Sequence, residues 1–103
     1  MPVDLIWHPQ ARLDLLDIYE IIGLDNPMAA ERFYDLVEAR ARNLIEHPRL
    51  GPRRWDIRPT ARMLVEGAYL ILFGTHPDTD EGPVDRVEII RVVDGRRNLA
   101  SLF

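Results

Sequence analysis

Residues 61–73 read ARMLVEGAYLILF, two runs of β-favouring apolar residues that are interrupted once, at Glu66-Gly67. Glycine adopts a positive φ at little cost, so a tight turn over residues 66–68 would fold residues 60–66 back onto residues 68–74. Glu-Gly is a weaker turn signal than Asn-Gly and leaves a shift of one residue in the register open. We therefore predict a β-hairpin here and interpret the rest of the chain around it.

Length and composition indicate one globular domain over residues 1–103. The chain is 47% apolar and 29% charged, which is ordinary for a soluble protein. No apolar run reaches the roughly 18–20 residues that span a bilayer, and no secretory signal is evident. We expect a cytoplasmic protein of bacterial type without a membrane segment. Because the chain has no cysteine, disulfides and thiolate metal sites are excluded.

Charge is distributed unevenly along the chain. All thirteen basic residues are arginine, and the net charge is −4. Residues 1–47 carry four arginines against nine acidic residues, a net −5, whereas residues 48–62 carry five arginines against Asp56 alone, a net +4. Nucleic-acid binders normally show a broad basic excess, so strong direct binding of nucleic acid is disfavoured. The local excess leaves open a contact with an acidic or anionic partner.

Two helices are predicted before the hairpin. Val3–Trp7 reads as a first or edge strand, and Pro9 suits the first turn of a helix that we expect to end near Gly23. The apolar stripe of that helix comprises Ala11, Leu15, Ile18 and Ile22, and Arg12, Asp14, Asp17 and Glu20 fall off it. Asn26-Pro27 predicts the start of a second helix that runs to about Glu46. A connection of three or four residues makes the two helices an antiparallel hairpin that covers a sheet.

Three further segments complete the predicted fold. Arg49–Pro59 reads as a loop or irregular strand, Thr75–Pro83 as a polar turn that we expect to be mobile, and Val84–Val93 as a central strand. Asp94-Gly95 then turns the chain into an arginine-rich tail. The predicted order is β-α-α-β-β-β, an α+β fold with a helical hairpin on a mainly antiparallel sheet of three or four strands. The opposite face of the sheet is expected to be partly open, and a partner could bind there.

Several different short motifs follow one another in a characteristic order along nearly the whole chain. They are Ala11-x-x-Asp14-Leu15-x-x-Ile18-Tyr19, Asn26-Pro27-x-Ala29-Ala30, His47-Pro48-x-x-Gly51, Arg62-x-Leu64-Val65, Ala68-Tyr69-x-Ile71, Val87-x-Ile89-Ile90-x-Val92 and Gly95-x-Arg97. Their order and spacing resemble the RelE/ParE superfamily of toxins from bacterial type II toxin–antitoxin modules.

Within that superfamily the chain is more similar to ParE-like members than to the ribosome-dependent ribonucleases. The RelE-type nucleases typically have an arginine where Leu70 follows Tyr69, lysines in the preceding strand and a tyrosine near the C-terminus, and none of these is present. The ParE-type ending, His-Gly-x-Arg-Asp, stands here as residues 94–98 with Asp94 and Asn98 at its ends. The resemblance implies DNA gyrase as the target and a ParD-like antitoxin as the neutralising partner.

Catalytic groups are harder to find in the sequence. RNA cleavage needs a base poised near neutrality, and each histidine has a simpler interpretation. His8 and His47 precede proline at helix boundaries, where we expect caps, and His76 is expected to be a solvated loop residue. Tyr69 reads as a core or rim aromatic. No metal cluster, cofactor motif or nucleophile triad is evident, so we expect neither metal nor cofactor. Whether the protein is an enzyme stays open, with binding favoured over catalysis.

Site residues follow from these hypotheses. Arg62 opens an apolar strand, so it either reaches the rim or contacts a partner. We expect a target-binding cluster in which four arginines converge: Arg62, Arg91, Arg96 and Arg97. The antitoxin is expected to contact Leu16, Tyr19, Phe33, Arg53, Arg54, Trp55, Tyr69 and Ile71, with an acidic segment on residues 49–62. The alternative is a RelE-like mRNA endoribonuclease with Arg62, Arg96 and Arg97 around the phosphate. A third hypothesis is an inactive relative that only binds antitoxin.

Overall fold

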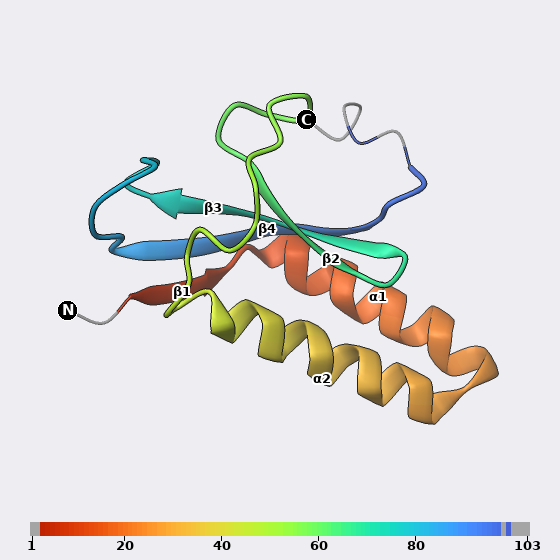
Figure 1. The fold of residues 1–103 in the computed structure, drawn as a ribbon. Helices are drawn as coiled ribbons and strands as arrows, with labels where there is room; N and C mark the ends of the chain where they lie inside the picture. Colours follow the sequence, from red (N-terminus) through yellow and green to blue (C-terminus); the bar gives the residue numbers. More distant parts are fainter. Residues whose placement is uncertain (1–2, 98, 100–103) are drawn as a thin grey trace.

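A four-stranded sheet with two helices on one face forms the protein (Figure 1). The computed structural model describes residues 3–97 and 99. The elements are β1 (Asp4–Trp7), α1 (Pro9–Asp25), α2 (Pro27–Asn43), β2 (Arg62–Glu66), β3 (Tyr69–His76) and β4 (Arg86–Asp94). The strand order is β1-β4-β3-β2, with β1 parallel to β4 and the other pairs antiparallel. This confirms the predicted α+β fold.

The predicted β-hairpin is β2 and β3. Gly67 has a φ of 61°, and Glu66 lies opposite Tyr69, so Gly67 and Ala68 form a two-residue turn. Glycine at the first central position is typical of a type II′ turn, whose twist matches that of the strands. The bounds of β2, β3 and β4 differ from the predicted ranges by at most two residues at each end. The register fixed by Glu66 opposite Tyr69 places Ile71 and Phe73 on the helix side of the sheet.

The two helices form a tighter hairpin than the sequence predicted. Asn26 alone connects them, and its Oδ1 accepts the Ala29 N–H at 3.0 Å as the cap of α2. The prediction that α1 ends near Gly23 was wrong, because α1 continues to Asp25 and Gly23 lies against Ala30 of α2. The prediction that α2 reaches Glu46 was also wrong, since the helix ends at Asn43 and turns follow.

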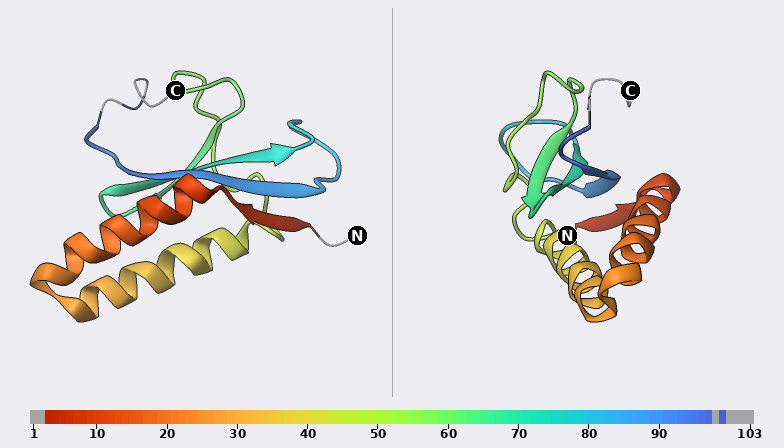
Figure 2. Two further views of the ribbon diagram at one scale, coloured as in Figure 1. Left: turned by 180° about the vertical axis from the view of Figure 1, so that it is seen from behind. Right: turned by 90° about the vertical axis from the view of Figure 1, so that its right-hand side faces the viewer.

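Most of the core lies between the helices and the sheet. Its fully buried side chains include Leu15, Val37, Ile71, Phe73 and Ile89. A smaller apolar cluster lies on the opposite face of the sheet, where residues 44–61 cross from α2 and cover part of that face (Figure 2); its members are Ile57, Leu70, Leu72 and Val93. The end of the helical hairpin around residue 26 extends away from the sheet in both figures. It therefore exposes surface that the core does not cover.

Candidate functional site

Arg62, expected at the rim or on a partner, is buried inside the protein. Only 5% of the residue is exposed, and its guanidinium donates to the Gly51 carbonyl at 3.3 Å and to Asp80 Oδ1 at 3.1 Å. Burial lowers the pKa of Arg62, and the neighbouring Arg53 lowers it further. Arg62 therefore neither reaches the rim nor is exposed to a partner, and its role in this fold is structural.

Residues 77–82, expected to be mobile, are held by arginines of residues 49–62. Arg53 donates to Asp78 Oδ1 at 2.8 Å and to Asp80 Oδ1 at 2.9 Å. Arg49 donates to the carbonyls of Thr79 and Gly82 at 3.0 and 2.9 Å. The hydrogen bond from Arg53 lowers the pKa of Asp80. The polar segment lacks an apolar anchor, but these charge-assisted hydrogen bonds replace one.

Arg54 and Trp55, the other predicted antitoxin contacts within residues 49–62, also have partners in the same chain. Arg54 forms a bidentate pair with Asp56 at 2.8 and 2.7 Å, and the hydrogen bond lowers the pKa of Asp56. Arg53 lies over the ring of Trp55, with 5.0 Å from Cζ to the centroid. Trp55 itself is 66% exposed. Of the three loop residues predicted to bind antitoxin, only Trp55 is mostly free to do so.

The other three candidate arginines lie in β4 and just after it. Arg91 donates to both carboxylate oxygens of Asp14 at 2.7 and 3.1 Å, and this hydrogen bonding raises the pKa of Arg91. Arg96 pairs with Asp94, which lowers the pKa of Asp94 to about 2. Arg96 and the exposed Arg97 line a hollow of about 320 Å³ whose other lining residues include Ile18, Ile21 and Tyr69. Arg97 is thus exposed beside this hollow.

Convergence of the four arginines was a wrong prediction. Arg62 lies opposite Phe73, whereas Asp94, two residues before Arg96, lies opposite Tyr69. Four residues of an extended strand separate Phe73 from Tyr69, roughly 13 Å. Arg62 therefore occupies one end of the sheet and Arg96 and Arg97 the other. The replaced residue Asn98 of the expected ParE-type ending lies outside the described residues.

Asp14 is a functional-site candidate that the sequence reasoning placed wrongly. It was assigned to the solvent side of α1, yet it is 8% exposed and also accepts the Val92 N–H at 3.1 Å. Its carboxylate therefore joins α1 to β4 next to the Arg96–Arg97 turn. The available signal was its spacing, because Asp14 follows the buried Ala11 by three residues and precedes the buried Ile18 by four.

Tyr19 and Phe33, both predicted to contact antitoxin, are partly buried on the helical hairpin. Tyr19 packs edge-on against Tyr34 at 5.7 Å between ring centroids and donates to Glu31 at 2.8 Å, which raises the pKa of Tyr19. Phe33 packs against Tyr69 at 4.9 Å between ring centroids, and the partly buried Tyr69 takes the rim position, one of the two predicted for it. Ile71 is fully buried in the core, so its expected contact with antitoxin is wrong for this fold.

Exposed leucines on α1 are a further feature that the single apolar stripe did not predict. Leu13, Leu16 and Leu24 are 54%, 45% and 87% exposed, and Met28 at the start of α2 is 72% exposed. The three leucines fall on one side of α1, which Asp17 and Glu20 share. The signal was present in the sequence as apolar residues on both sides of the helix. Of these residues, only Leu16 was predicted to contact a partner.

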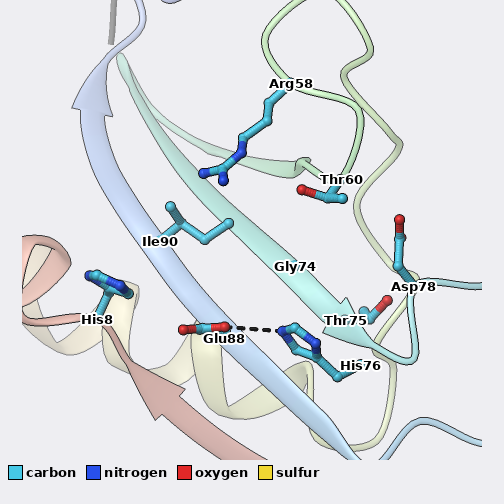
Figure 3. A pocket seen from close by; sticks show the side chains of 9 residues that line it. All are labelled: His8, Arg58, Thr60, Gly74, Thr75, His76, Asp78, Glu88 and Ile90. Atoms are coloured by element: carbon cyan, nitrogen blue, oxygen red, sulfur yellow. Dashed lines mark hydrogen bonds and ion pairs between the residues drawn. The ribbon is translucent and has the colours of Figure 1, made fainter. Parts of the chain in front are cut away.

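The open part of the sheet holds a small polar pocket (Figure 3). Its volume is about 210 Å³, and Arg58, Gly74 and Ile90 are among its lining residues. Glu88 lies between His8 and His76, and its Oε2 is 3.0 Å from His76 Nε2, within hydrogen-bond distance. His76 is thus paired rather than only solvated. An imidazole and a carboxylate in contact can exchange a proton with a bound ligand.

The other two histidines meet the helix ends differently. His8 occupies the N-cap position of α1 with an extended backbone, but its side chain makes no capping hydrogen bond. The backbone N–H of His47 donates at 3.1 Å to the carbonyl of Asn43, the last residue of α2, and so satisfies one acceptor at that helix end. Among the described residues, no group of three or more His, Asp or Glu side chains is arranged to hold a metal ion. Nor does any described helix have the length and apolar character to cross a membrane.

Comparison with known proteins gives two results. The family described as "ParE toxin of type II toxin-antitoxin system, parDE" matches residues 5–99. Among solved structures, one titled "Chromosomal ParDE TA system from P. aeruginosa" is similar, with a TM-score of 0.71 and 20% identity over 89% of this chain and 95% of that chain. At that identity the likeness concerns the fold. No curated protein matches the chain significantly.

Proposed function

Because the chain belongs to the ParE toxin family of parDE type II toxin–antitoxin systems, we propose that it arrests bacterial growth by binding DNA gyrase. A cognate ParD-like antitoxin neutralises it, and both encounters occur in the bacterial cytoplasm. The family match over residues 5–99 carries this proposal. The geometry supports binding rather than catalysis, since the arginines expected around a scissile phosphate lie at opposite ends of the sheet.

The end of β4 is the surface that we assign to the target. Arg97 is exposed there, Arg96 is fixed by Asp94, and Tyr69 provides an aromatic wall of the hollow. Arginine and tyrosine are the residues most often found at energetically important points of protein interfaces. Arg91 and Asp14 lie behind this surface and position it, whereas Arg62 stabilises the distant loop.

Controlled expression in a bacterial host tests the proposal. The wild-type chain should stop growth with loss of DNA supercoiling while transcripts stay intact. The variant Arg96→Ala/Arg97→Ala should grow normally at equal protein level. Arg86→Ala is the matched control, because Arg86 is an exposed arginine at the other end of β4, and it should stay toxic. Toxicity retained by the double variant would contradict the assigned surface, and intact supercoiling during arrest would contradict the target.

One observation favours mRNA cleavage as a second candidate function. His76 and Glu88 form a hydrogen-bonded pair in a pocket that Arg58 also lines, which supplies the base that the sequence lacked. In this alternative the catalytic set is not Arg62, Arg96 and Arg97. The same expression experiment separates the two functions: transcripts cut within translated codons by the wild type, and intact in His76→Ala, would establish the alternative.

A further inference from the structure

The two edge strands of the sheet, β1 and β2, differ in how far other segments cover them. On the outer edge of β2, Met63 N–H donates to the Pro52 carbonyl at 3.1 Å. On the same edge, Arg40 donates to the Val65 carbonyl at 3.2 Å. β1 forms the opposite margin of the sheet, as Figure 2 shows. An uncovered edge strand offers unpaired backbone groups to another chain, so the covering of β1 decides whether a partner strand can add there.

Backbone groups of Leu5 and Trp7 point to the outer edge of β1. In the parallel pair with β4, Asp4 N–H donates at 3.0 Å to the Asp85 carbonyl, and His8 N–H donates to β4 at 2.9 Å. Successive residues of a strand direct their N–H and C=O groups to alternate edges, so Leu5 and Trp7 face outward. Within the part of the chain that the structure describes, no segment hydrogen-bonds to these outward groups. The edge at β1 is therefore open.

Side chains of β1 and of the residue after it divide between the two faces of the sheet. Leu5 and Trp7 pack against the main core on the helix side. Asp4, Ile6 and His8 form a row on the open face, where all three are exposed, Ile6 by 40%. Neither the Asp4 carboxylate nor the His8 ring has a hydrogen-bond or ion-pair partner among the described residues. Both groups are thus free to pair with another chain.

We propose that two copies of this chain pair antiparallel along β1, about a two-fold axis that passes between their Ile6 side chains. In this register Ile6 lies opposite Ile6 of the second copy. Asp4 lies opposite His8 of the second copy, and the same pair recurs at the other end of the strand. Such an interface is isologous, because one surface serves both subunits. The inference concerns self-association and does not rest on the target or the antitoxin.

The same register satisfies the outward backbone groups. Leu5 lies opposite Trp7 of the second copy, and each of the two such pairs exchanges two N–H···O=C bonds. Ile6 and its counterpart form a non-hydrogen-bonded pair, the kind in which opposite side chains approach most closely. Four backbone bonds, one apolar contact and two acid–imidazole pairs therefore form together and join the two sheets into one.

The order of side chains in β1 identifies a second copy as the matching occupant. A strand added antiparallel must present a base opposite Asp4, an apolar group opposite Ile6 and an acid opposite His8. Read in its own direction, that strand has an acid, an apolar residue and a base at alternate positions, which is the pattern of residues 4–8 themselves. A uniformly acidic or basic strand would leave one end mismatched. Because β1 has four residues, the interface is small and the dimer weak and reversible.

Charge exchange between two variants tests the pairing. Sedimentation velocity of the purified full chain, from about 1 μM to about 1 mM, should show a monomer becoming a dimer. Asp4→Lys sets an ammonium opposite each imidazole, and His8→Glu sets carboxylate opposite carboxylate, so each variant alone should associate at least tenfold more weakly. A mixture of the two places the ammonium opposite the new carboxylate and should recover wild-type association. Recovery requires that both variants are folded, so misfolding cannot imitate it. A monomeric wild type, or a mixture without recovery, would overturn the proposal.

A like charge on the two-fold axis gives a second measurement. Ile6→Lys brings two ammonium groups opposite each other and should raise the dimer Kd at least tenfold. Val65→Lys is the matched control, because Val65 is a 53% exposed aliphatic residue on the covered edge strand β2, and its Kd should stay within twofold of wild type. An equal loss of association in both variants would contradict an interface at β1.

Hydrogen exchange locates the interface in the wild-type dimer. The amides of Leu5 and Trp7 should exchange at least tenfold more slowly in concentrated than in dilute protein, because they become bonded only in the dimer. The His8 amide, which already donates to β4, serves as the internal reference and should change little. A dimer in which the Leu5 and Trp7 amides exchange as fast as in the monomer would place the contact elsewhere and overturn the proposal.

Discussion

Arginines on the sheet side of the molecule and carboxylates on the helical hairpin differ in what they contact. Arg49, Arg53, Arg54 and Arg62 all donate to groups of the same chain, three of them to carboxylates. At the end of the hairpin, Asp17, Glu20, Asp25 and Asp35 form no ion pair with any described residue. The first region uses charge to hold a loop in place, and the second presents charge to the outside.

This difference shows why a local count of charges misleads about partners. Residues 48–62 are +4 in the sequence, yet two of the three carboxylates that neutralise them, Asp78 and Asp80, come from a segment 25 or more residues away from Arg53. Partner chemistry depends on the charge that remains after such pairing. By that measure the basic region is partly closed, because Asp78 and Asp80 reduce its net charge from +4 to +2, whereas the acidic hairpin is open.

The largest expected effect is on the loop that the arginines hold. A Cβ at Gly51 would overlap the Met63 carbonyl oxygen and lie 2.8 Å from Cε1 of Phe73. Neither backbone nor a fully buried ring can move aside cheaply, so Gly51→Ala should lower the free energy of unfolding by about 3 kcal/mol. Urea denaturation measures this. A change below about 1 kcal/mol would mean that residues 49–62 are held less closely than the structure shows.

A slightly smaller effect is expected where one buried pair joins hairpin and sheet. Asp14→Ala leaves the Arg91 guanidinium and the Val92 N–H without their acceptor, which should cost about 2 to 3 kcal/mol after discounting for the partial exposure of Arg91. The control is Asp17→Ala, one turn further along α1, which removes an exposed and unpaired carboxylate. Equal unfolding free energies for the two variants would contradict the distinction between the paired Asp14 and the exposed Asp17.

How far the sequence predicted the fold depends on the range of the interactions involved. The β-hairpin was predictable because Gly67 and its apolar flanks act locally, and Asn26-Pro27 identified the start of α2 for the same reason. The end of α1 was not. Gly23 is a good helix terminator in isolation, but packing against Ala30 of the second helix keeps it helical.

Candidate site residues were less predictable, because their roles depend on contacts between distant segments. Asp14 lies 77 residues from Arg91, and Arg62 lies 18 residues from Asp80. Nothing in the neighbourhood of either residue indicates the pair. Exposed side chains such as Leu16 and Trp55 were placed correctly on the surface, whereas Ile71 was not, because alternation along a strand does not say which face is covered.

Acid should lower the stability of the fold by protonating carboxylates that are paired with arginine, namely Asp56, Asp80 and Asp94. Arginine contacts lower the pKa values of Asp56 and Asp80 below their ordinary 3.8, and Arg96 lowers that of Asp94 to about 2. A depressed pKa in the folded state stabilises the fold above pH 3.8, and this contribution disappears as the pH falls through the folded-state values. Titration by carboxyl NMR shifts should find Asp94 near 2 in the wild type and higher in Arg96→Ala. An Asp94 that titrates near 3.8 in the wild type would contradict the pair.

The smallest expected effect has a sign that separates the two interpretations of the helical hairpin. If α1 ended near Gly23, as predicted from the sequence, and Gly23 had the positive φ common just after helices, Gly23→Ala would destabilise the protein. In the structure Gly23 is inside α1 with an ordinary helical φ, and an added Cβ would lie 3.7 Å from Cβ of Ala30, a normal contact. The substitution should therefore raise the free energy of unfolding by about 0.5 to 1 kcal/mol, since alanine is the better helix former. Gly67→Ala, at a φ of 61°, should change stability in the opposite direction by about 1 kcal/mol. A destabilising Gly23→Ala would mean that the hairpin end is not two helices in direct contact.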